Sequence, residues 1–376
     1  MNNILQFFLI GYAANSVTQQ HTIHQLFHLK CSVIPLEFTG EIPNEIIANR
    51  KALIIVLHDP CLHPQLFRIL GNIYRIPRHE RCGICWIPFD RYTGILFTIM
   101  QQNNMLGGVT SRVLFSKPER YLEGYYYYNP NHSTWICEPS SLPLDPSQCV
   151  LVNKSLQCLP FDYVVCQSDK MRQDFEAGGK VCISLNYPSS SMGAHYSREE
   201  RLKLSSMPYV LYDGSTTLSE LAGDNSFQAI LADINRSNGF VRIKNWKNPS
   251  LSAFSKINAL MGFRRGALPF YSRLTKFTYE QRWGGGTKLN VAARAKVPLI
   301  GYWQDSYESF SKGYPFIEYG TNEFDKYLQS ATYRQTILAQ SSALAHHILV
   351  NATPLGWANA VISFFCEVVK KELTLT

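Results

Sequence analysis

The stretch that decides the fold runs from residue 284 to residue 300 and reads GGGTKLNVAARAKVPLI. Three glycines come first, a segment of small helix-forming residues follows, and the apolar run Val-Pro-Leu-Ile ends the stretch. A glycine turn that opens a helix and leads into a buried strand is typical of α/β proteins, in which helices cover a parallel sheet. We therefore predict an α/β fold.

The same turn has the chemistry of an anion site. Gly285 and Gly286 let the backbone approach a ligand closely, and the helix that they open presents unpaired N–H groups at its positive dipole end. Thr287 and Lys288 follow, and Lys288 adds a full positive charge. We expect a diphosphate-binding site here, although a glycine turn that only caps a core-packed helix would have the same sequence. It is not a P-loop, because Lys and Thr stand in reversed order.

Basic residues concentrate around this turn. From Arg236 to Lys296 there are 13 basic residues and one acidic residue, a net charge of +12, whereas the whole chain carries +8. The remainder of the chain is therefore net acidic. Such a window suits phosphate or another anion, while a solvated basic face or an anionic membrane surface remains an alternative.

The first half of the chain alternates strand-like and helix-like segments. Strand-like runs cover residues 3–13, 31–38, 52–57, 83–89, 161–168 and 180–188, with helix-like segments between them. Residues 109–148 are irregular and aromatic, and we expect short strands and an elaborated loop there. Continuous apolar strands that alternate with helices predict a parallel sheet covered on both faces.

The composition changes after this region. Residues 189–207 are rich in Ser and charge, which predicts an interdomain linker, and a second α/β series begins at Tyr209. In this series we expect a less regular basic stretch over 247–283 and helices near 322–329 and 330–350. The last segment carries Trp357, Val361 and Phe365 at helical spacing. We predict an N-terminal domain over 1–195, a second domain over 208–353 and a closing helix over 354–376.

These features together resemble glycosyltransferases of the GT-B fold. The segment around Lys288 resembles the part of their C-terminal domain that flanks the nucleotide-sugar diphosphate, and the order of elements resembles theirs over nearly the whole chain. The resemblance implies two Rossmann-like domains that face an interdomain cleft, with the C-terminal helix crossing back to the N-terminal domain. It implies transfer of a sugar from a nucleotide sugar (UDP-, GDP- or similar) to a glycan or lipid-linked glycan, with no tightly bound cofactor or metal.

Further donor-binding candidates follow from this resemblance. Lys288 is the first candidate for the phosphates. Members of the family often carry a Glu for the ribose about three residues after this Lys, where Asn290, Val291 and Ala292 stand here. Asn290 is a weaker substitute for that carboxylate. Gly214 and Ser215 could offer backbone N–H groups to the same phosphates. The other candidates are Arg242 and Lys244, for which surface charge is the alternative explanation, and Asp305 and Glu308, for which it is helix capping.

Three residues are candidates for a catalytic base. His58 and Asp59 follow one predicted strand, and Asp90 follows the next. The carboxyl ends of parallel strands are where an acceptor is expected to lie. Asp59 and Asp90 could equally order a loop or cap a helix, and a retaining enzyme needs no separate base.

Other classes of protein fit less well. His79, Cys82 and Cys85 have a metal-like spacing without a second pair nearby, so buried thiols are favoured over zinc. The basic window matches no nucleic-acid-binding signature. No apolar run suffices to span a bilayer, and ten scattered Cys indicate a reducing, cytoplasmic setting, with peripheral membrane association left open. The alternatives are a nucleotide-sugar epimerase of the same fold and a non-catalytic protein that binds sugar or nucleic acid.

Overall fold

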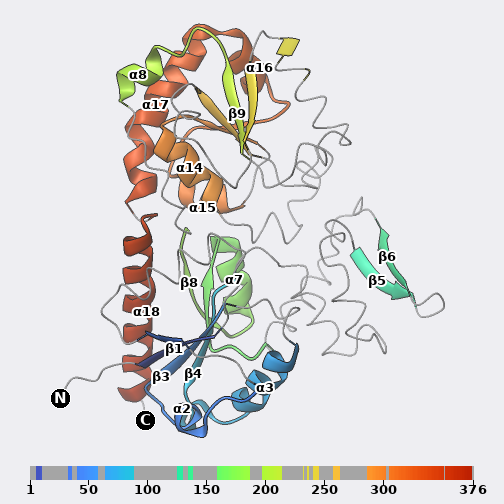
Figure 1. Cartoon of the computed structure of the whole chain (residues 1–376), viewed down its shortest axis with the longest axis vertical. Helices are drawn as coiled ribbons and strands as arrows, with labels where there is room; N and C mark the ends of the chain where they lie inside the picture. The colour runs from blue at the N-terminus through green and yellow to red at the C-terminus, as the bar shows by residue number, and fades with distance from the viewer. Residues whose placement is uncertain are drawn as a thin grey trace. The chain divides into compact units, whose positions relative to one another are not determined.

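Two parallel β-sheets form the core of the protein (Figure 1). The structure is a computed structural model, and it describes residues 6–10, 33–35, 40–57, 64–88, 125–129, 134–138, 159–186, 197–213, 232, 235–236, 240–244, 257–262, 286–301, 305–350 and 352–374. The chain divides into two compact units. The first holds the described residues up to Asn186 and from Pro354 onward, and the second holds the described residues between them.

The first unit contains a six-stranded sheet with the strand order β2-β1-β3-β4-β7-β8, and every pair in it is parallel. Its strands are β1 (Gln6–Ile10), β2 (Val33–Pro35), β3 (Ala52–Val56), β4 (Gly83–Trp86), β7 (Tyr163–Cys166) and β8 (Val181–Ser184). Its helices are α2 (Asn44–Ile47), α3 (Pro64–Tyr74), η1 (Arg78–Glu80), α7 (Asp169–Ala177) and α18 (Pro354–Thr374). Outside this sheet, β5 (Tyr125–Asn129) and β6 (Thr134–Glu138) pair antiparallel.

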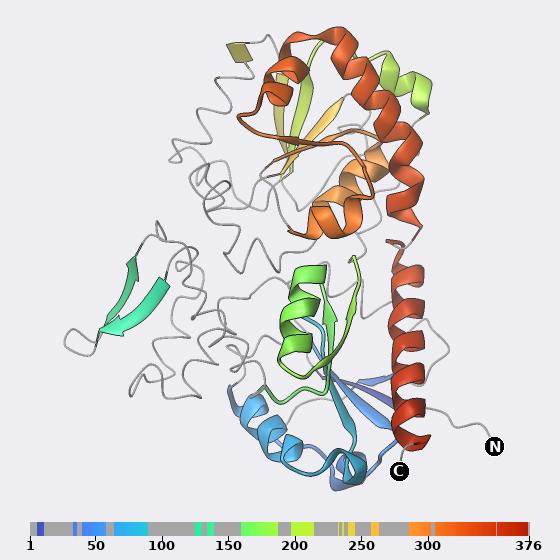
Figure 2. The same cartoon turned by 180° about the vertical axis from the view of Figure 1, so that it is seen from behind.

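The two faces of this sheet are covered by different parts of the chain. On one face, Ile54 and Val164 pack in one cluster with Leu70 of α3 and Phe175 of α7. On the other face lies α18, whose Phe365 ring is 6.1 Å from the ring of Phe7 and 6.1 Å from that of Tyr163. Figure 2 shows α18 running alongside the sheet. The apolar stripe of α18 is fully buried and consists of Trp357, Val361, Phe365 and Val369.

None of the helices within the described ranges is long and apolar enough to cross a membrane.

The second unit contains a five-stranded parallel sheet with the order β10-β9-β11-β12-β13. Its strands are β9 (Tyr209–Asp213), β10 (Phe240–Lys244), β11 (Ala259–Gly262), β12 (Leu299–Gly301) and β13 (Phe316–Glu318). Its helices are α8 (Arg198–Leu202), α14 (Thr287–Ala295), α15 (Asp305–Ser311), α16 (Asn322–Gln329) and α17 (Ala331–Leu349). Leu299 shares a cluster with α14, α15 and α17, whereas its neighbour Ile300 packs with α16 on the other face.

The predicted α/β class and its parallel sheets are confirmed. Two segments differ from the sequence interpretation. The run from 247 to 283, expected to be irregular, contains β11, which pairs between β9 and β12. The segment expected to be a linker contains the short helix α8, which contacts α17. Apolar residues in both segments have become part of the core of the second unit, since Ile257 and Leu202 belong to its cluster.

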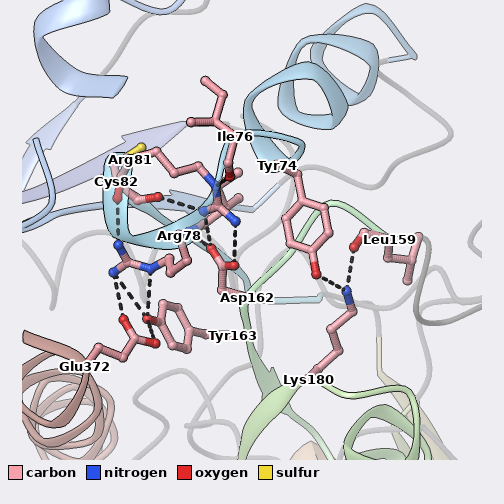
Figure 3. A network of polar contacts seen from close by, with 11 residues as sticks. Tyr74, Ile76, Arg78, Arg81, Cys82, Leu159, Asp162, Tyr163, Lys180 and Glu372 are labelled. Atoms are coloured by element: carbon pink, nitrogen blue, oxygen red, sulfur yellow. Dashed lines mark hydrogen bonds and ion pairs between the residues drawn. The ribbon is translucent and has the colours of Figure 1, made fainter. Parts of the chain in front are cut away.

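A buried ion pair joins two central strands of the first unit at the edge where they begin (Figure 3). Arg81 precedes β4 and donates both terminal nitrogens to the Asp162 carboxylate, at 2.6 and 2.8 Å. Asp162 precedes β7 and also accepts the backbone N–H of Ile84 at 2.8 Å. The Arg81 side chain is 3% exposed, so water contributes little and each charge depends on the other.

A second polar cluster fastens the end of α18 to the same sheet (Figure 3). The Tyr163 hydroxyl donates to Oε1 of Glu372 at 2.6 Å, and Arg78 lies 3.0 Å from Oε2. Burial raises the pKa of Tyr163, which keeps its hydroxyl protonated as a donor. Gly83 makes room for this ring, because a Cβ there would lie 2.8 Å from Tyr163.

The second unit has its own buried polar network. Asn258, which directly precedes β11, donates to the carbonyl of Leu204 at 2.6 Å and accepts the N–H of Tyr209 at 2.9 Å. The Tyr327 hydroxyl donates to the backbone carbonyl of Asn258 at 2.6 Å. Arg334 donates to four backbone carbonyls, which belong to Ser205, Ser206, Tyr327 and Leu328. The amino ends of β9 and β11 are thereby tied to α16 and α17.

We predict that Phe365→Ala lowers the free energy of unfolding by about 3–5 kcal/mol, because it leaves a cavity between α18 and the sheet. Lys370→Ala, an exposed position on the same helix, should change it by less than about 0.5 kcal/mol. Urea unfolding measures both variants. Equal, small losses would contradict the packing of α18 as part of this core.

We also predict that Asp162→Asn costs about 3–5 kcal/mol of stability, because it leaves the Arg81 guanidinium buried without a counter-charge. The matched control is Glu176→Gln. It breaks an exposed pair with Arg172, one turn apart on α7, and should cost no more than about 0.5 kcal/mol. Denaturant midpoints compare the two, and similar midpoints would refute the role of the buried pair.

Candidate functional site

The candidate site lies where the strands of the second sheet end. In the parallel register Asp213 of β9 lies opposite Lys244 of β10, and Gly262 of β11 lies opposite Gly301 of β12. These four residues are the last of their strands, so the four ends meet at one edge of the sheet. Ligands of open parallel sheets bind at this carboxyl edge.

Helix α14 brings its first turn to this edge. Its last residues lead directly into β12, because Val297 donates to the Ala292 carbonyl and the Pro298 carbonyl accepts from Leu260. The end of α14 is therefore at the amino edge of the sheet. Its nine residues rise about 13 Å, which is more than the roughly 10 Å length of a three-residue strand. Packed antiparallel to β12, α14 thus begins at the carboxyl edge.

The sequence explains why the helix forms and where it stops. Leu289, Ala292 and Ala293 are fully buried in the core cluster, and alanine is the strongest helix former. The helix ends at Lys296, which adopts the left-handed conformation with φ of 55° and donates its N–H to Ala293. Glycine is the usual residue at such a cap, so Lys296 holds a conformation that side chains rarely adopt.

The first turn of α14 has the features from which an anion site was predicted. Gly286 is the N-cap with φ of −83° and ψ of 20°, and as a glycine it provides no side chain to cap the N–H groups that follow. The first turn contains no acidic residue, and it carries Thr287 and Lys288, both half-buried. Uncapped N–H groups, the positive dipole end and a lysine charge all favour a phosphate here.

The other donor-side candidates lie in different surroundings. Arg242 and Lys244 are in β10, which β9 and β11 separate from β12, so about 14 Å lies between strands β10 and β12. Asp305 begins α15 at the carboxyl edge, and Glu308 is exposed on the same helix. Asn290 is 0% exposed and lies on the buried side of α14 with Leu289, and its contact with a ribose stays a prediction.

Six candidates lie outside the described residues, and they are His58, Asp59, Asp90, Gly214, Ser215 and Gly285. Their described neighbours are at carboxyl edges. Leu57 continues β3 and donates its N–H to Ile10, and Ile87 continues β4 and donates to Val56. Gly214 directly follows the last residue of β9.

Sequence reasoning missed two residues at this edge. Gly262 ends the unpredicted strand β11. Ser306 lies in the first turn of α15 and is fully buried. The only sequence signal for Ser306 was its place directly after the candidate Asp305.

The His79, Cys82 and Cys85 motif does not form a metal site. The His79 ring is 59% exposed and pairs with Glu80 at 3.1 Å, whereas Cys82 and Cys85 are fully buried free thiols. Burial raises the pKa of Cys82 to about 11 and raises that of Cys85 as well. Across the described part of the chain, no group of His, Cys, Asp or Glu side chains is placed to hold a metal ion.

These thiols predict a labelling order. At pH 8 Cys82 and Cys85 should remain protonated, because their pKa values lie above that pH, and only the thiolate reacts. Exposed Cys366 should react with iodoacetamide first, and the two buried thiols should react only after unfolding. Peptide mass spectrometry resolves the sites. Labelling of Cys82 as fast as Cys366 in the native protein would show this burial to be wrong.

Comparisons with known proteins give matches in structure only. No family model matches the chain, and no curated protein matches its sequence. The chain is similar to UGT2 of Phytolacca americana complexed with UDP-2fluoro-glucose and pterostilbene, at 9% identity and a TM-score of 0.42, over 97% of this chain and 100% of that one. It is similar to sucrose-phosphate synthase from Thermosynechococcus elongatus at 9% identity and a TM-score of 0.46, over 96% and 99% of the two chains. It is also similar to MurG of Acinetobacter baumannii at 10% identity and a TM-score of 0.40, over 92% of this chain and 98% of that one.

These solved structures are glycosyltransferases of the GT-B fold, the family that the sequence resembles. The fold described above rests on the strand order and parallel pairing of the chain itself.

Proposed function

We propose that the protein is a glycosyltransferase that moves a sugar from a nucleotide sugar to a glycan or lipid-linked glycan. The observation that carries the proposal is the first turn of α14. There, uncapped N–H groups and Lys288 lie at the carboxyl edge of a parallel sheet, with no acid in that turn. This is the arrangement that a nucleoside diphosphate needs.

The chemistry of the transfer explains why such a turn is useful. Breaking the bond between the sugar and the diphosphate places negative charge on the leaving phosphate. Fixed N–H dipoles and a lysine stabilise that charge without reorganising, so they lower the barrier. Thr287 and Gly286 lie beside Lys288, and Gly285, Gly214 and Ser215 are proposed to complete the phosphate contacts. In this proposal no tightly bound metal or cofactor takes part.

Arg242, Lys244, Asp305 and Glu308 have supporting parts in this proposal. Arg242 and Lys244 belong to β10, which two strands separate from β12, and we propose that their charges raise the positive potential of the edge. Asp305 and Glu308 belong to α15, which begins at the same edge and offers carboxylates to sugar or ribose hydroxyls.

The first unit is proposed to bind the acceptor. In the sequence His58 and Asp59 follow β3 and Asp90 follows β4, and we propose that one of the three takes the acceptor proton. We further propose a cytoplasmic enzyme whose basic second half favours the anionic surface where lipid-linked acceptors reside.

The first test is a thermal-shift screen against UDP-, GDP-, ADP- and CMP-sugars. A ligand at about 100 times its dissociation constant stabilises a protein by about 2.7 kcal/mol, which such a screen detects as a shift of several degrees. No stabilisation by any nucleotide sugar would refute the donor site. Conversion of the bound nucleotide sugar without acceptor would identify an epimerase instead.

We predict that Lys288→Ala weakens binding of the matching nucleoside diphosphate about tenfold or more, because a charge-assisted contact to phosphate is lost. Binding of the nucleoside alone should hardly change. Lys288→Arg should retain most of the affinity, and Lys326→Ala, an exposed lysine on α16, should retain all of it. Isothermal titration calorimetry measures these affinities. Equal loss for nucleoside and nucleoside diphosphate would contradict a phosphate role.

A further inference from the structure

Ser306 is a buried hydroxyl that lacks a hydrogen-bond partner within the described structure. Its residue is 0% exposed, and its Oγ is buried with no partner. Two other hydroxyls of the same unit are paired. Ser341, also 0% exposed, donates to the Ile337 carbonyl at 2.9 Å, and Thr321 donates to the Glu318 carbonyl at 2.7 Å. An unpaired hydroxyl in a core opposes folding, and Ala at position 306 would remove that cost.

The position of Ser306 directs its hydroxyl to the carboxyl edge. The next residue, Tyr307, fixes which side of α15 faces inward, because its ring lies 5.1 Å from that of Phe316 in β13. Ser306 lies in the first turn of the helix, and Cα–Cβ bonds in helices tilt toward the N-terminus. The hydroxyl therefore leans toward the end of β12, where the helix begins.

The same edge and the same face of the sheet carry the first turn of α14. Leu289 of α14, Leu299 of β12 and Tyr307 of α15 belong to one core cluster, so both helices cover one face. The connections from β11 through α14 to β12 and through α15 to β13 join neighbouring strands. Both helices consequently begin at the carboxyl edge, on either side of β12.

We propose that Ser306 is a donor-binding residue whose hydroxyl donates a hydrogen bond to a phosphate oxygen of the nucleotide. This inference rests on the proposed function and adds a neutral donor to the charge of Lys288. The Ser306 hydroxyl, on the neighbouring helix α15, would approach a phosphate oxygen bound at the first turn of α14. The unpaired hydroxyl is then retained for ligand binding at a cost to the stability of the free protein.

The test compares Ser306→Ala with Ser342→Ala. Ser342 also has a buried Oγ without a partner in the described residues, but it lies in the middle of α17, so it controls for the removal of an unpaired hydroxyl. The probes are UDP, GDP, ADP and CDP together with their nucleosides. Isothermal titration calorimetry gives affinity, and thermal unfolding of the free proteins gives stability.

We expect Ser306→Ala to weaken binding of the nucleoside diphosphate about tenfold or more while leaving the nucleoside unaffected. The free variant should be as stable as the wild type or more stable, which shows that it folds. Ser342→Ala should bind like the wild type.

Two results would overturn the inference. If Lys288→Ala loses diphosphate affinity while Ser306→Ala binds within twofold of the wild type, the donor site stands and Ser306 has no part in it. If the wild type binds none of the four diphosphates, the proposed function fails and this inference fails with it.

Discussion

A parallel sheet exposes apolar side chains on both faces, and both faces must be covered. This constraint organises the molecule. In the second unit α14, α15 and α17 cover one face and α16 covers the other, and all four come from one stretch of chain. The first unit meets the same requirement differently, because α3 and α7 cover one face and α18 covers the other.

The amino and carboxyl edges of the sheets carry different kinds of polar group. Buried polar networks lie where the strands begin, with Arg81 and Asp162 in the first unit and Asn258 in the second. These networks hold the amino ends of the strands in place and form hydrogen bonds with buried backbone groups. The carboxyl edge of the second sheet instead carries the uncapped first turn of α14 and the unpaired hydroxyl of Ser306. Groups satisfied within the protein thus gather at one edge, and groups able to bind a ligand gather at the other.

The local sequence pattern was enough to predict those helices and strands whose own residues determine their secondary structure. The β-branched run over 52–57 predicted β3, and the periodicity over 322–329 predicted α16. Strand β11 could not be predicted, because Asn258 interrupts its apolar run within a strongly basic segment. That asparagine is buried only because Leu204, Tyr209 and Tyr327 from distant segments bond to it.

The candidate site was predictable to a similar extent. Glycines and a lysine at a helix start are the sequence signal for an anion site, and the structure confirms that Gly286 and Lys288 lie at the start of a helix. Asn290 looked available because it follows Lys288 closely, yet the rotation of α14 turns it into the core with Leu289 and Ala293. Ser306 resembles an ordinary first-turn serine in the sequence, and only its burial in the folded chain shows that its hydroxyl is enclosed. The orientation of a helix about its axis is a tertiary property, which local sequence does not encode.

The placement of α18 has a consequence for biosynthesis. A ribosome completes every strand of the first sheet long before it adds residues 354–374, so Phe7 and Tyr163 emerge with one face of their sheet uncovered. The first unit can close only after the second unit has been translated. During that interval the nascent chain displays the apolar face that α18 later covers.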